Sequence, residues 1–222
     1  MIKIYLLDFN GAEADKNYLS ALAPYVRETK NEKQKRERIF SYELLRIACE
    51  ETLFRKMPEI LRDENGRPYF SSGDVDFNLS HDGEMAALIL SDEGRCGIDI
   101  QMIGARVGDR LIKKTEKRYE ENKISDLIKN GGEIDRKIFI YTVSDSGEIS
   151  SAEEENYEIS ESEGRDFFTL WTDTEAVSKA DGGGLSLLGK ADLSGNFSFL
   201  RLKVKDKKRN EYVVSACKIS NS

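Results

Sequence analysis

Apolar and polar residues alternate along the middle of the chain, which predicts a set of paired β-strands there. Val75, Phe77 and Leu79 alternate with polar residues as far as a turn signal at 80–83. An apolar run at 85–90 is short enough to be a buried strand, and a tight connection at 92–94 leads into a second alternating stretch at 96–101. We therefore expect antiparallel strands across 77–101.

The strand predicted at 96–101 presents two polar side chains on one face. Asp99 and Gln101 alternate with Ile98 and Ile100. Side chains two residues apart on a strand share a face and lie about 6.5 to 7 Å apart. One hard cation could therefore contact both Asp99 and Gln101. The sole histidine of the chain, His81, precedes them at the turn signal.

Strand and helix periodicities continue on both sides of this stretch. Before it, they predict a strand at 2–7, a helix at 12–26 interrupted near Pro24, and a core-packing helix that begins just before Arg38 and runs toward Pro58. A turn at 65–69 then connects to the central strands. After the central strands, the patterns predict a charged helix at 110–128, a strand at 137–143, a helix at 167–180 and a closing hairpin over 197–219.

The segment 144–166 differs in kind from the rest of the chain. It is rich in aspartate and glutamate, and Arg165 is its one basic residue. This composition predicts a mobile acidic loop. Contact with a partner protein is the alternative interpretation of the same charges.

Charged residues at helical spacing occur at two places. Trp171, Glu175 and Lys179 lie four residues apart on one helical face, beside the core stripe marked by Leu170 and Val177. Taken alone, such a Glu and Lys are typical of a surface ion pair. The basic run at 30–38, also taken alone, favours a solvated helix face.

Composition limits the classes of partner. A chain of 222 residues makes one large domain or two smaller halves and can bury roughly 70% of its unfolded surface. Lys plus Arg number 34 against 41 for Asp plus Glu, and the net charge of −7 argues against general binding to nucleic acid. An anionic ligand must therefore meet a local basic cluster. The sequence contains no Walker phosphate loop and no dinucleotide fingerprint.

The sequence also predicts the compartment. No apolar run approaches the roughly 20 residues of a membrane helix, and the first residues predict a strand rather than a signal peptide. We therefore expect a cytoplasmic protein that does not bind membranes. Cys49, Cys96 and Cys217 are far apart and embedded in apolar patterns, which predicts buried thiols rather than disulfides or a zinc cluster.

Several short motifs follow one another in a specific order. They are Lys33 with Arg36, Arg38 at the start of a helix, Gly66-Arg67-Pro68, Phe77-Asn78-Leu79-Ser80-His81-Asp82-Gly83, Gly97-Ile98-Asp99-Ile100-Gln101, and Trp171-Thr172-Asp173-Thr174-Glu175-Ala176-Val177-Ser178-Lys179 followed by Gly182, Gly184 and Leu185. Each motif is weak alone. The ordered set resembles the 4′-phosphopantetheinyl transferases of the surfactin-synthetase-activating type, over nearly the whole chain apart from 117–166.

The resemblance implies a fold and a reaction. The fold is a pseudo-two-fold α+β protein of two similar α/β halves, 1–101 and 102–222, with the site in the cleft between them and the acidic insertion at 144–166 in the second half. The reaction transfers the 4′-phosphopantetheine arm of coenzyme A to a serine of an apo acyl or peptidyl carrier protein. It depends on Mg²⁺, releases 3′,5′-adenosine bisphosphate and serves fatty-acid, polyketide or nonribosomal peptide synthesis. We expect the protein to act as a monomer.

The resemblance also assigns roles to residues. Asp99, Gln101 and Glu175 are the implied Mg²⁺ ligands, and Asp99, Glu175 and Lys179 the implied catalytic residues. Glu175 would help to deprotonate the acceptor serine, and Lys179 would stabilise the leaving phosphate. The implied contacts to coenzyme A are Lys33, Arg36, Arg38, Arg67, Ser80, His81 and Lys179. For His81, this context favours phosphate binding over a structural role.

The chain departs from the family pattern at several positions. Gln101 stands where the family has a third acidic ligand, and Thr174 stands where a lysine precedes the catalytic glutamate. Tyr42 replaces a small residue, and the segment between Glu116 and Phe167 is longer than usual. A transferase-like protein that binds coenzyme A or a carrier protein without turnover therefore remains the alternative function.

Overall fold

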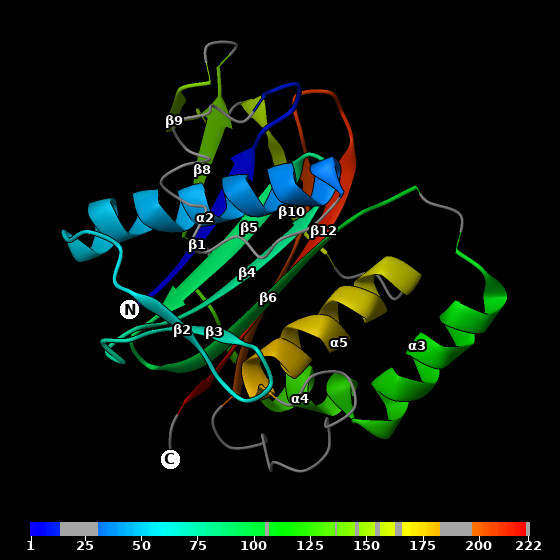
Figure 1. Ribbon diagram of the computed structural model, residues 1–222. Coiled ribbons are helices and arrows are strands. Elements are labelled where there is room, and N and C mark those ends of the chain that lie inside the picture. Colours follow the sequence, from blue (N-terminus) through cyan, green and yellow to red (C-terminus); the bar gives the residue numbers. More distant parts are fainter. Residues whose placement is uncertain are drawn as a thin grey trace.

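The structure is a computed structural model that describes residues 1–13, 31–104, 107–135, 137–144, 147–153, 156–162, 166–182 and 197–220 (Figure 1). Most of the helix predicted at 12–26 lies outside the described residues, as do Lys30 and the motif residues Gly184 and Leu185. None of the helices in the described ranges is both long and apolar enough to cross a membrane. All three cysteines are free and buried, as predicted.

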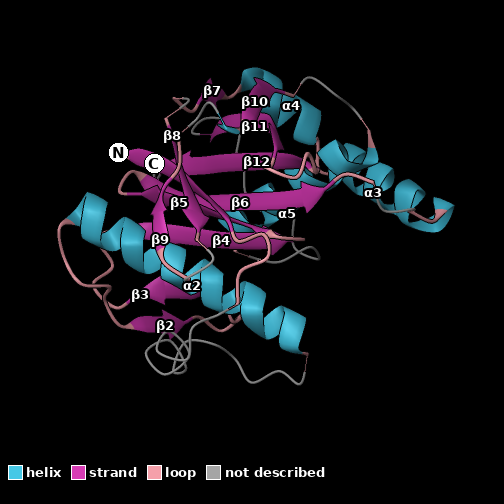
Figure 2. Cartoon of the chain, turned by 90° about the horizontal axis from the view of Figure 1, so that it is seen from above, coloured by secondary structure: helices cyan, strands magenta, loops and turns pink. Residues whose placement is uncertain are grey.

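The first sheet has the strand order β4-β5-β1-β8-β9. Its strands are β1 Ile2–Asp8, β4 Asp76–Asp82, β5 Met85–Ser91, β8 Ile138–Val143 and β9 Ile149–Ser151. The pair β1–β8 is parallel and the other pairs are antiparallel. Helix α2, Glu32–Leu53, lies across this sheet (Figures 1 and 2). It packs Phe40, Leu44 and Leu45 against β1 and β5.

The second sheet has the order β10-β11-β12-β6, and a short strand β7 also pairs with β11. Its strands are β6 Gly94–Met102, β7 Gly132–Glu133, β10 Glu158–Glu161, β11 Phe197–Lys205 and β12 Glu211–Ser220. Helix α5, Phe167–Asp181, packs on β6 and β12, with α3 Asp109–Glu121 and α4 Ile124–Asn130 beside it. A small hairpin, β2 Ile60–Arg62 and β3 Pro68–Phe70, contains the predicted turn.

The two sheets pack face to face, with helices on the outer faces. Alternate residues of β1 show this: Tyr5 and Leu7 join the cluster under α2, whereas Ile4 and Leu6 join the cluster shared with β6, β11 and β12. Strand β5 is buried along its whole length because both of its faces are covered, which explains its uninterrupted apolar sequence. The described residues therefore form an α+β arrangement, the predicted fold class.

The two sheets share one connectivity. The chain order β1-α2-β4-β5 gives the spatial order β4-β5-β1, and the order β6-α5-β11-β12 gives β11-β12-β6. In both sheets the neighbouring strands of these triplets are antiparallel. Strands β4 and β6 are consequently edge strands of their sheets, and they lie beside each other.

Several element boundaries differ from those predicted. Helix α2 begins at Glu32 rather than just before Arg38, because the Asn31 side chain caps it by accepting a hydrogen bond from the Gln34 N–H. Strand β4 continues through His81 to Asp82, so the turn falls at Gly83, which adopts φ +59°. The helix predicted at 110–128 is two helices, separated at Lys123 with φ +50°.

The acidic segment is not a plain loop. The described part of 144–166 includes β9, which pairs with β8, and β10, which pairs with β11. The prediction of a loop is wrong for these residues, because strand pairing outweighs the composition there. Strands β9 and β10 lie at the ends of the two sheets opposite to β4 and β6. Mobility of this segment stays a prediction.

A polar cluster links the end of β1 to the turn between β11 and β12. Asp8 and Asp206 are both nearly inaccessible to solvent. The Asn10 side-chain amide donates to both, at 2.8 Å to Asp8 Oδ1 and 2.7 Å to Asp206 Oδ2. Tyr157 donates its hydroxyl to Asp8, and the Asn210 side chain donates to Asp206. The cluster fixes the relative position of the two sheets at this end.

We predict that Asn10→Asp destabilises the protein, because it replaces the shared donor with a third carboxylate beside two buried ones. The free energy of unfolding should fall by roughly 3 kcal/mol, the scale of an uncompensated buried charge. Urea denaturation followed by circular dichroism measures it. The matched control Asn130→Asp, at the exposed end of α4, should change stability by less than about 1 kcal/mol. Equal effects of the two substitutions would contradict a bridging role for Asn10.

Candidate functional site

The edge of β6 is sealed by polar side chains of β4. The backbone N–H groups of Cys96, Ile98 and Met102 donate to the side chains of Asp76, Asn78 and Asp82, at 2.8, 3.1 and 2.8 Å. The alternation of polar residues along β4 therefore has a structural cause. Its polar face satisfies backbone donors that an edge strand would otherwise leave open.

Asp99, Ser80 and Lys179 meet at this edge, from β6, β4 and α5 respectively. The Lys179 ammonium lies 2.7 Å from Asp99 Oδ1 and donates to Ser80 Oγ at 3.1 Å. Ser80 Oγ donates to Asp99 Oδ1 at 2.7 Å. Lys179 also donates to the Ile98 carbonyl at 3.0 Å. Three residues that the sequence predicted separately thus share one hydrogen-bonded cluster.

Glu175 lies one turn before Lys179 on the same face of α5 and is half-buried. Burial raises the pKa of its carboxyl, and repulsion from Asp99 raises it further, whereas Lys179 and Arg118 lower it. Asp99 and Glu175 are therefore close enough to repel each other. The cluster contains two carboxylates and one ammonium, so a cation would be attracted to it.

Helix α5 is held against β6 by two features. A Cβ on Gly97 would lie 2.0 Å from the Ala176 carbonyl oxygen, so only glycine allows the helix backbone to approach this closely. Nearer the start of the helix, the buried Asp173 is paired with Arg201 of β11 and accepts a hydrogen bond from Ser215 of β12 at 2.7 Å. These contacts fix the position of Glu175 and Lys179 relative to Asp99.

Gln101 faces β4, as Asp99 does. Its side-chain amide donates to Asp82 Oδ2, which also accepts from the Met102 N–H. Gln101 thereby retains its carbonyl oxygen as a ligand atom. The sequence reasoning missed Asp82, although its place in the alternating pattern of β4, two residues beyond Ser80, could have indicated it.

His81 lies beside α2 rather than in the Asp99 cluster. Its Nδ1 is 3.4 Å from Glu37 Oε2, and Lys33 lies 3.6 Å from the other oxygen of Glu37. Burial lowers the pKa of His81 to about 4, and the charges of Lys179 and Arg38 contribute in the same direction. His81 is therefore neutral near pH 7. Glu37 was not predicted, because a carboxylate within a basic run indicates only an ordinary helix pair.

Arg36 is occupied by structural contacts. Its guanidinium donates to both carboxylate oxygens of Glu84, at 3.0 and 2.6 Å, and to the carbonyls of Ala12 and Phe9. It also stacks over the rings of Phe9 and Phe40. Arg36 thus ties α2 to the turn after β4. The structure does not bring it into the Asp99 cluster.

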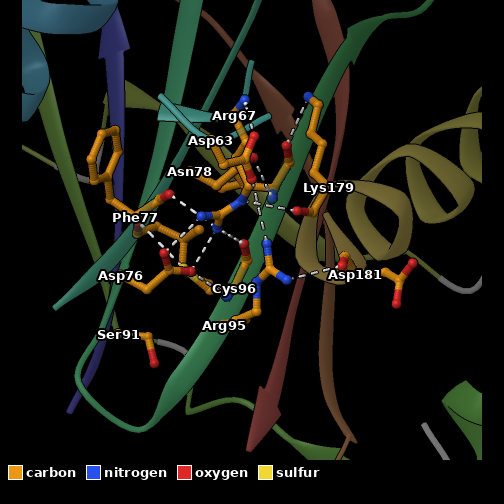
Figure 3. A network of polar contacts seen from close by, with 12 residues as sticks. Asp63, Arg67, Asp76, Phe77, Asn78, Ser91, Arg95, Cys96, Lys179 and Asp181 are labelled. Atoms are coloured by element: carbon orange, nitrogen blue, oxygen red, sulfur yellow. Dashed lines mark hydrogen bonds and ion pairs between the residues drawn. The ribbon is translucent and has the colours of Figure 1, made fainter. Parts of the chain in front are cut away.

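The Arg67 guanidinium likewise makes its contacts within the protein (Figure 3). It forms a bidentate pair with Asp76, at 2.8 and 2.6 Å, and donates to the carbonyls of Cys96 and Lys179, at 3.1 and 3.2 Å. It therefore joins the β2–β3 hairpin to β4, β6 and α5. The sequence motif located this residue, but it gave no sign that the guanidinium would be used within the protein.

The donor set at the Asp99 cluster suits a hard divalent cation. Asp99 and Glu175 offer carboxylate oxygens and Gln101 offers an amide oxygen. Within the described ranges, no group of three or more His, Cys, Asp or Glu residues is arranged to hold a metal. A metal here would therefore rely on two carboxylates, with ligand water or a substrate phosphate completing its coordination.

Comparison with known proteins relates part of the chain to one enzyme family. The chain is 51% identical over 51 residues to the 4′-phosphopantetheinyl transferase AcpT of Salmonella typhi. This match covers 22% of this chain and 27% of the relative. AcpT of Escherichia coli strain K12 is 46% identical over 57 residues, 25% of this chain and 29% of that protein. A putative 4′-phosphopantetheinyl transferase of Haemophilus influenzae is 41% identical over 64 residues, 27% of this chain and 26% of that protein.

The chain thus spans about a quarter of the length of the curated relatives that it matches. No family model matches it. The similarity supports a relationship to 4′-phosphopantetheinyl transferases in general, and it does not distinguish the surfactin-synthetase-activating type.

We predict that His81 titrates near pH 4 in the folded protein. It is the sole histidine, so one imidazole signal in proton NMR reports it without ambiguity. The unfolded chain takes up this proton near pH 6.5. Since the unfolded state then binds more protons between pH 6.5 and 4, protonation of His81 destabilises the fold as the pH falls through that interval. The same chain in urea is the control, and a folded-state midpoint near 6.5 would contradict burial of the imidazole.

Proposed function

We propose that the protein is a 4′-phosphopantetheinyl transferase that modifies a serine of an apo carrier protein with the phosphopantetheine arm of coenzyme A. One observation carries the proposal: Asp99, Ser80 and Lys179, taken from three motifs far apart in the sequence, meet in one cluster beside Glu175. The similarity to named transferases over part of the chain supports the same function.

The reaction would move one phosphoryl-linked group between two oxygens. The serine hydroxyl oxygen attacks the β-phosphorus of coenzyme A, the bond from that phosphorus to the bridging oxygen breaks, and 3′,5′-adenosine bisphosphate leaves with that oxygen. Little covalent chemistry is required of the protein, so positioning and neutralisation of charge dominate.

The residues of the cluster fit these tasks. The raised pKa of Glu175 makes its carboxylate a better acceptor for the serine proton than an exposed glutamate. Lys179 places an ammonium within 3.1 Å of Ser80 and Asp99, where it would stabilise charge on the leaving phosphate. Asp99, Glu175 and the Gln101 carbonyl would hold Mg²⁺, which when bound supplies neutralisation of the diphosphate.

The contacts to coenzyme A divide into two groups. Lys33, Arg38, Ser80 and His81 remain proposed ligands, and Lys33 is exposed at the start of α2. His81 would act as a neutral hydrogen-bond donor rather than as a cation. Arg36 and Arg67 are proposed to act by holding the site together, since their guanidinium groups already contact Glu84 and Asp76.

The repeated connectivity supports the proposed pseudo-two-fold architecture of the surfactin-synthetase-activating type. The two β-α-β-β units begin at β1 and at β6. We therefore propose two halves that meet where β4 and β6 lie side by side. This division favours a boundary before β6, near residue 93, over the boundary at 101 expected from the sequence.

Binding without turnover is the alternative function, and two observations favour it. Gln101 supplies no negative charge to the metal site and pairs with Asp82. Thr174, at the position of the family's lysine, is buried and donates to the Leu170 carbonyl at 2.7 Å, so it offers no cation. Activity measurements separate this alternative from an active enzyme.

We predict that the purified protein, given coenzyme A, Mg²⁺ and a panel of apo carriers, adds one phosphopantetheine mass to a carrier serine. Glu175→Gln should lower kcat/KM by at least about 100-fold, the usual contribution of a general base. The matched control Glu59→Gln, at an exposed position, should leave the rate unchanged. Intact-protein mass spectrometry measures the product. Tight binding of coenzyme A with no transfer to any carrier would establish the alternative.

We predict that Gln101→Glu strengthens the response to Mg²⁺. Without the metal, the new carboxylate faces Asp82 and the melting temperature falls; Mg²⁺ relieves that repulsion and restores it. Half-maximal activity should also require a several-fold lower Mg²⁺ concentration. Thermal denaturation with and without Mg²⁺ provides a readout independent of activity. If this variant and the exposed control Gln34→Glu respond alike to Mg²⁺, Gln101 does not lie at the metal.

A further inference from the structure

Asp82 ends β4 two residues beyond Ser80 and faces β6. Three contacts between β4 side chains and β6 backbone N–H groups share an offset of 20 residues: Asp76 with Cys96, Asn78 with Ile98, and Asp82 with Met102. The two strands therefore run parallel and side by side (Figure 1). Ser80 meets the Asp99 carboxylate within this alignment. Asp82 consequently meets the next side chain on the same face of β6, which is Gln101.

The Asp82 carboxylate decides how the Gln101 amide is turned. An amide carries a donor nitrogen and an acceptor oxygen on one carbon, whereas an ionised carboxylate only accepts hydrogen bonds. Gln101 must therefore present its nitrogen to Asp82, as it does in the structure. Asp82 Oδ2 is itself held by the Met102 N–H at 2.8 Å. The Gln101 carbonyl oxygen thus points away from Asp82 and can serve as a ligand.

Asp82 also carries a negative charge that its described contacts do not cancel. Its carboxylate accepts from two neutral groups, the Gln101 amide and the Met102 N–H. Asp76, on the same face of β4, is paired instead with the guanidinium of Arg67. A negative charge beside a neutral amide ligand increases the attraction of the site for a cation.

The residues at positions 82 and 101 match each other. A glutamate at 101 would set two carboxylates against each other across the strands. An asparagine at 82 would let the Gln101 amide bind in either orientation, because asparagine both donates and accepts. Aspartate on β4 and glutamine on β6 together provide one ligand oxygen and one negative charge. A single glutamate at position 101 would provide the same two properties.

We propose that Asp82 is a positioning residue of the metal site, which holds the Gln101 carbonyl oxygen toward Mg²⁺ and supplies the negative charge that position 101 lacks. This inference rests on the proposed transferase function. Asp82 acts through Gln101 and does not itself contact the metal. Removal of an outer partner of this kind typically weakens metal binding about 10- to 100-fold.

The test exchanges the two functional groups. Asp82→Asn removes the charge and the fixed orientation of the amide but keeps an oxygen for the Met102 N–H. In Asp82→Asn/Gln101→Glu, the new asparagine can donate to the new carboxylate, so the pair is restored in reverse. The matched control is Asp135→Asn, at an exposed position. Isothermal titration calorimetry measures Mg²⁺ binding with coenzyme A present and without a carrier, so the readout does not depend on turnover.

In Asp82→Asn, the Kd for Mg²⁺ should rise at least about tenfold, a loss of about 1.4 kcal/mol. The reversed pair should recover most of that loss, and the control should match the wild type. The melting temperature without Mg²⁺ should change little in Asp82→Asn, because the edge of β6 stays closed. Its kcat at saturating Mg²⁺ should be preserved, whereas the half-maximal rate should require more Mg²⁺.

Two results would overturn the inference. Equal Mg²⁺ affinity in Asp82→Asn and the wild type would show that Asp82 only closes the edge of β6. A reversed pair that binds Mg²⁺ no better than Asp82→Asn would show that the two side chains do not act together. If the wild type neither binds Mg²⁺ nor transfers to any carrier, the proposed function fails as well; if it does both and either result is found, only the role of Asp82 fails.

Discussion

The free edge of β6 is the constraint on which the candidate site depends. An unpaired strand edge exposes backbone donors and acceptors that must be satisfied. Here the donors are met by Asp76, Asn78 and Asp82 of β4, and two of the acceptors are met by Arg67 and Lys179. Lys179 therefore belongs both to the structure that closes the edge and to the cluster proposed to perform the chemistry.

The ion pairs around the candidate site and in the rest of the described structure differ in how their charges balance. The pairs Arg36–Glu84, Arg67–Asp76 and Arg201–Asp173 are each closed by one cation and one carboxylate. At Asp99, two carboxylates share the neighbouring Lys179, with Arg118 further along α3 acting on Glu175. Balanced pairs hold elements together, whereas the imbalance at Asp99 supports the proposed site for a cation and for the phosphates that it would bind.

The acidic insertion and the candidate site occupy opposite ends of the two sheets. Strands β9 and β10 extend the sheets at one edge, and β4 and β6 form the other edge. Glu158 of the insertion pairs with Lys205 of β11 and with Arg209 in the turn after it, so part of the charge of the insertion is neutralised within the protein. These contacts favour a structural role for the strands of the insertion.

The sequence by itself predicted the main strands and helices and the candidate site residues. Local periodicity was sufficient to predict β1, β5, β6 and α5. Each of these elements buries one or two faces along its length, and its apolar positions repeat with that burial. Motif order located Asp99, Glu175 and Lys179. Only the tertiary structure decided how each charge is used. A guanidinium that binds phosphate and one that closes a strand edge look the same in sequence, and the partners of Arg36 and Arg67 come from distant elements. The same holds for Gln101, whose contact with Asp82 exists only because β4 and β6 are brought together across the edges of two sheets.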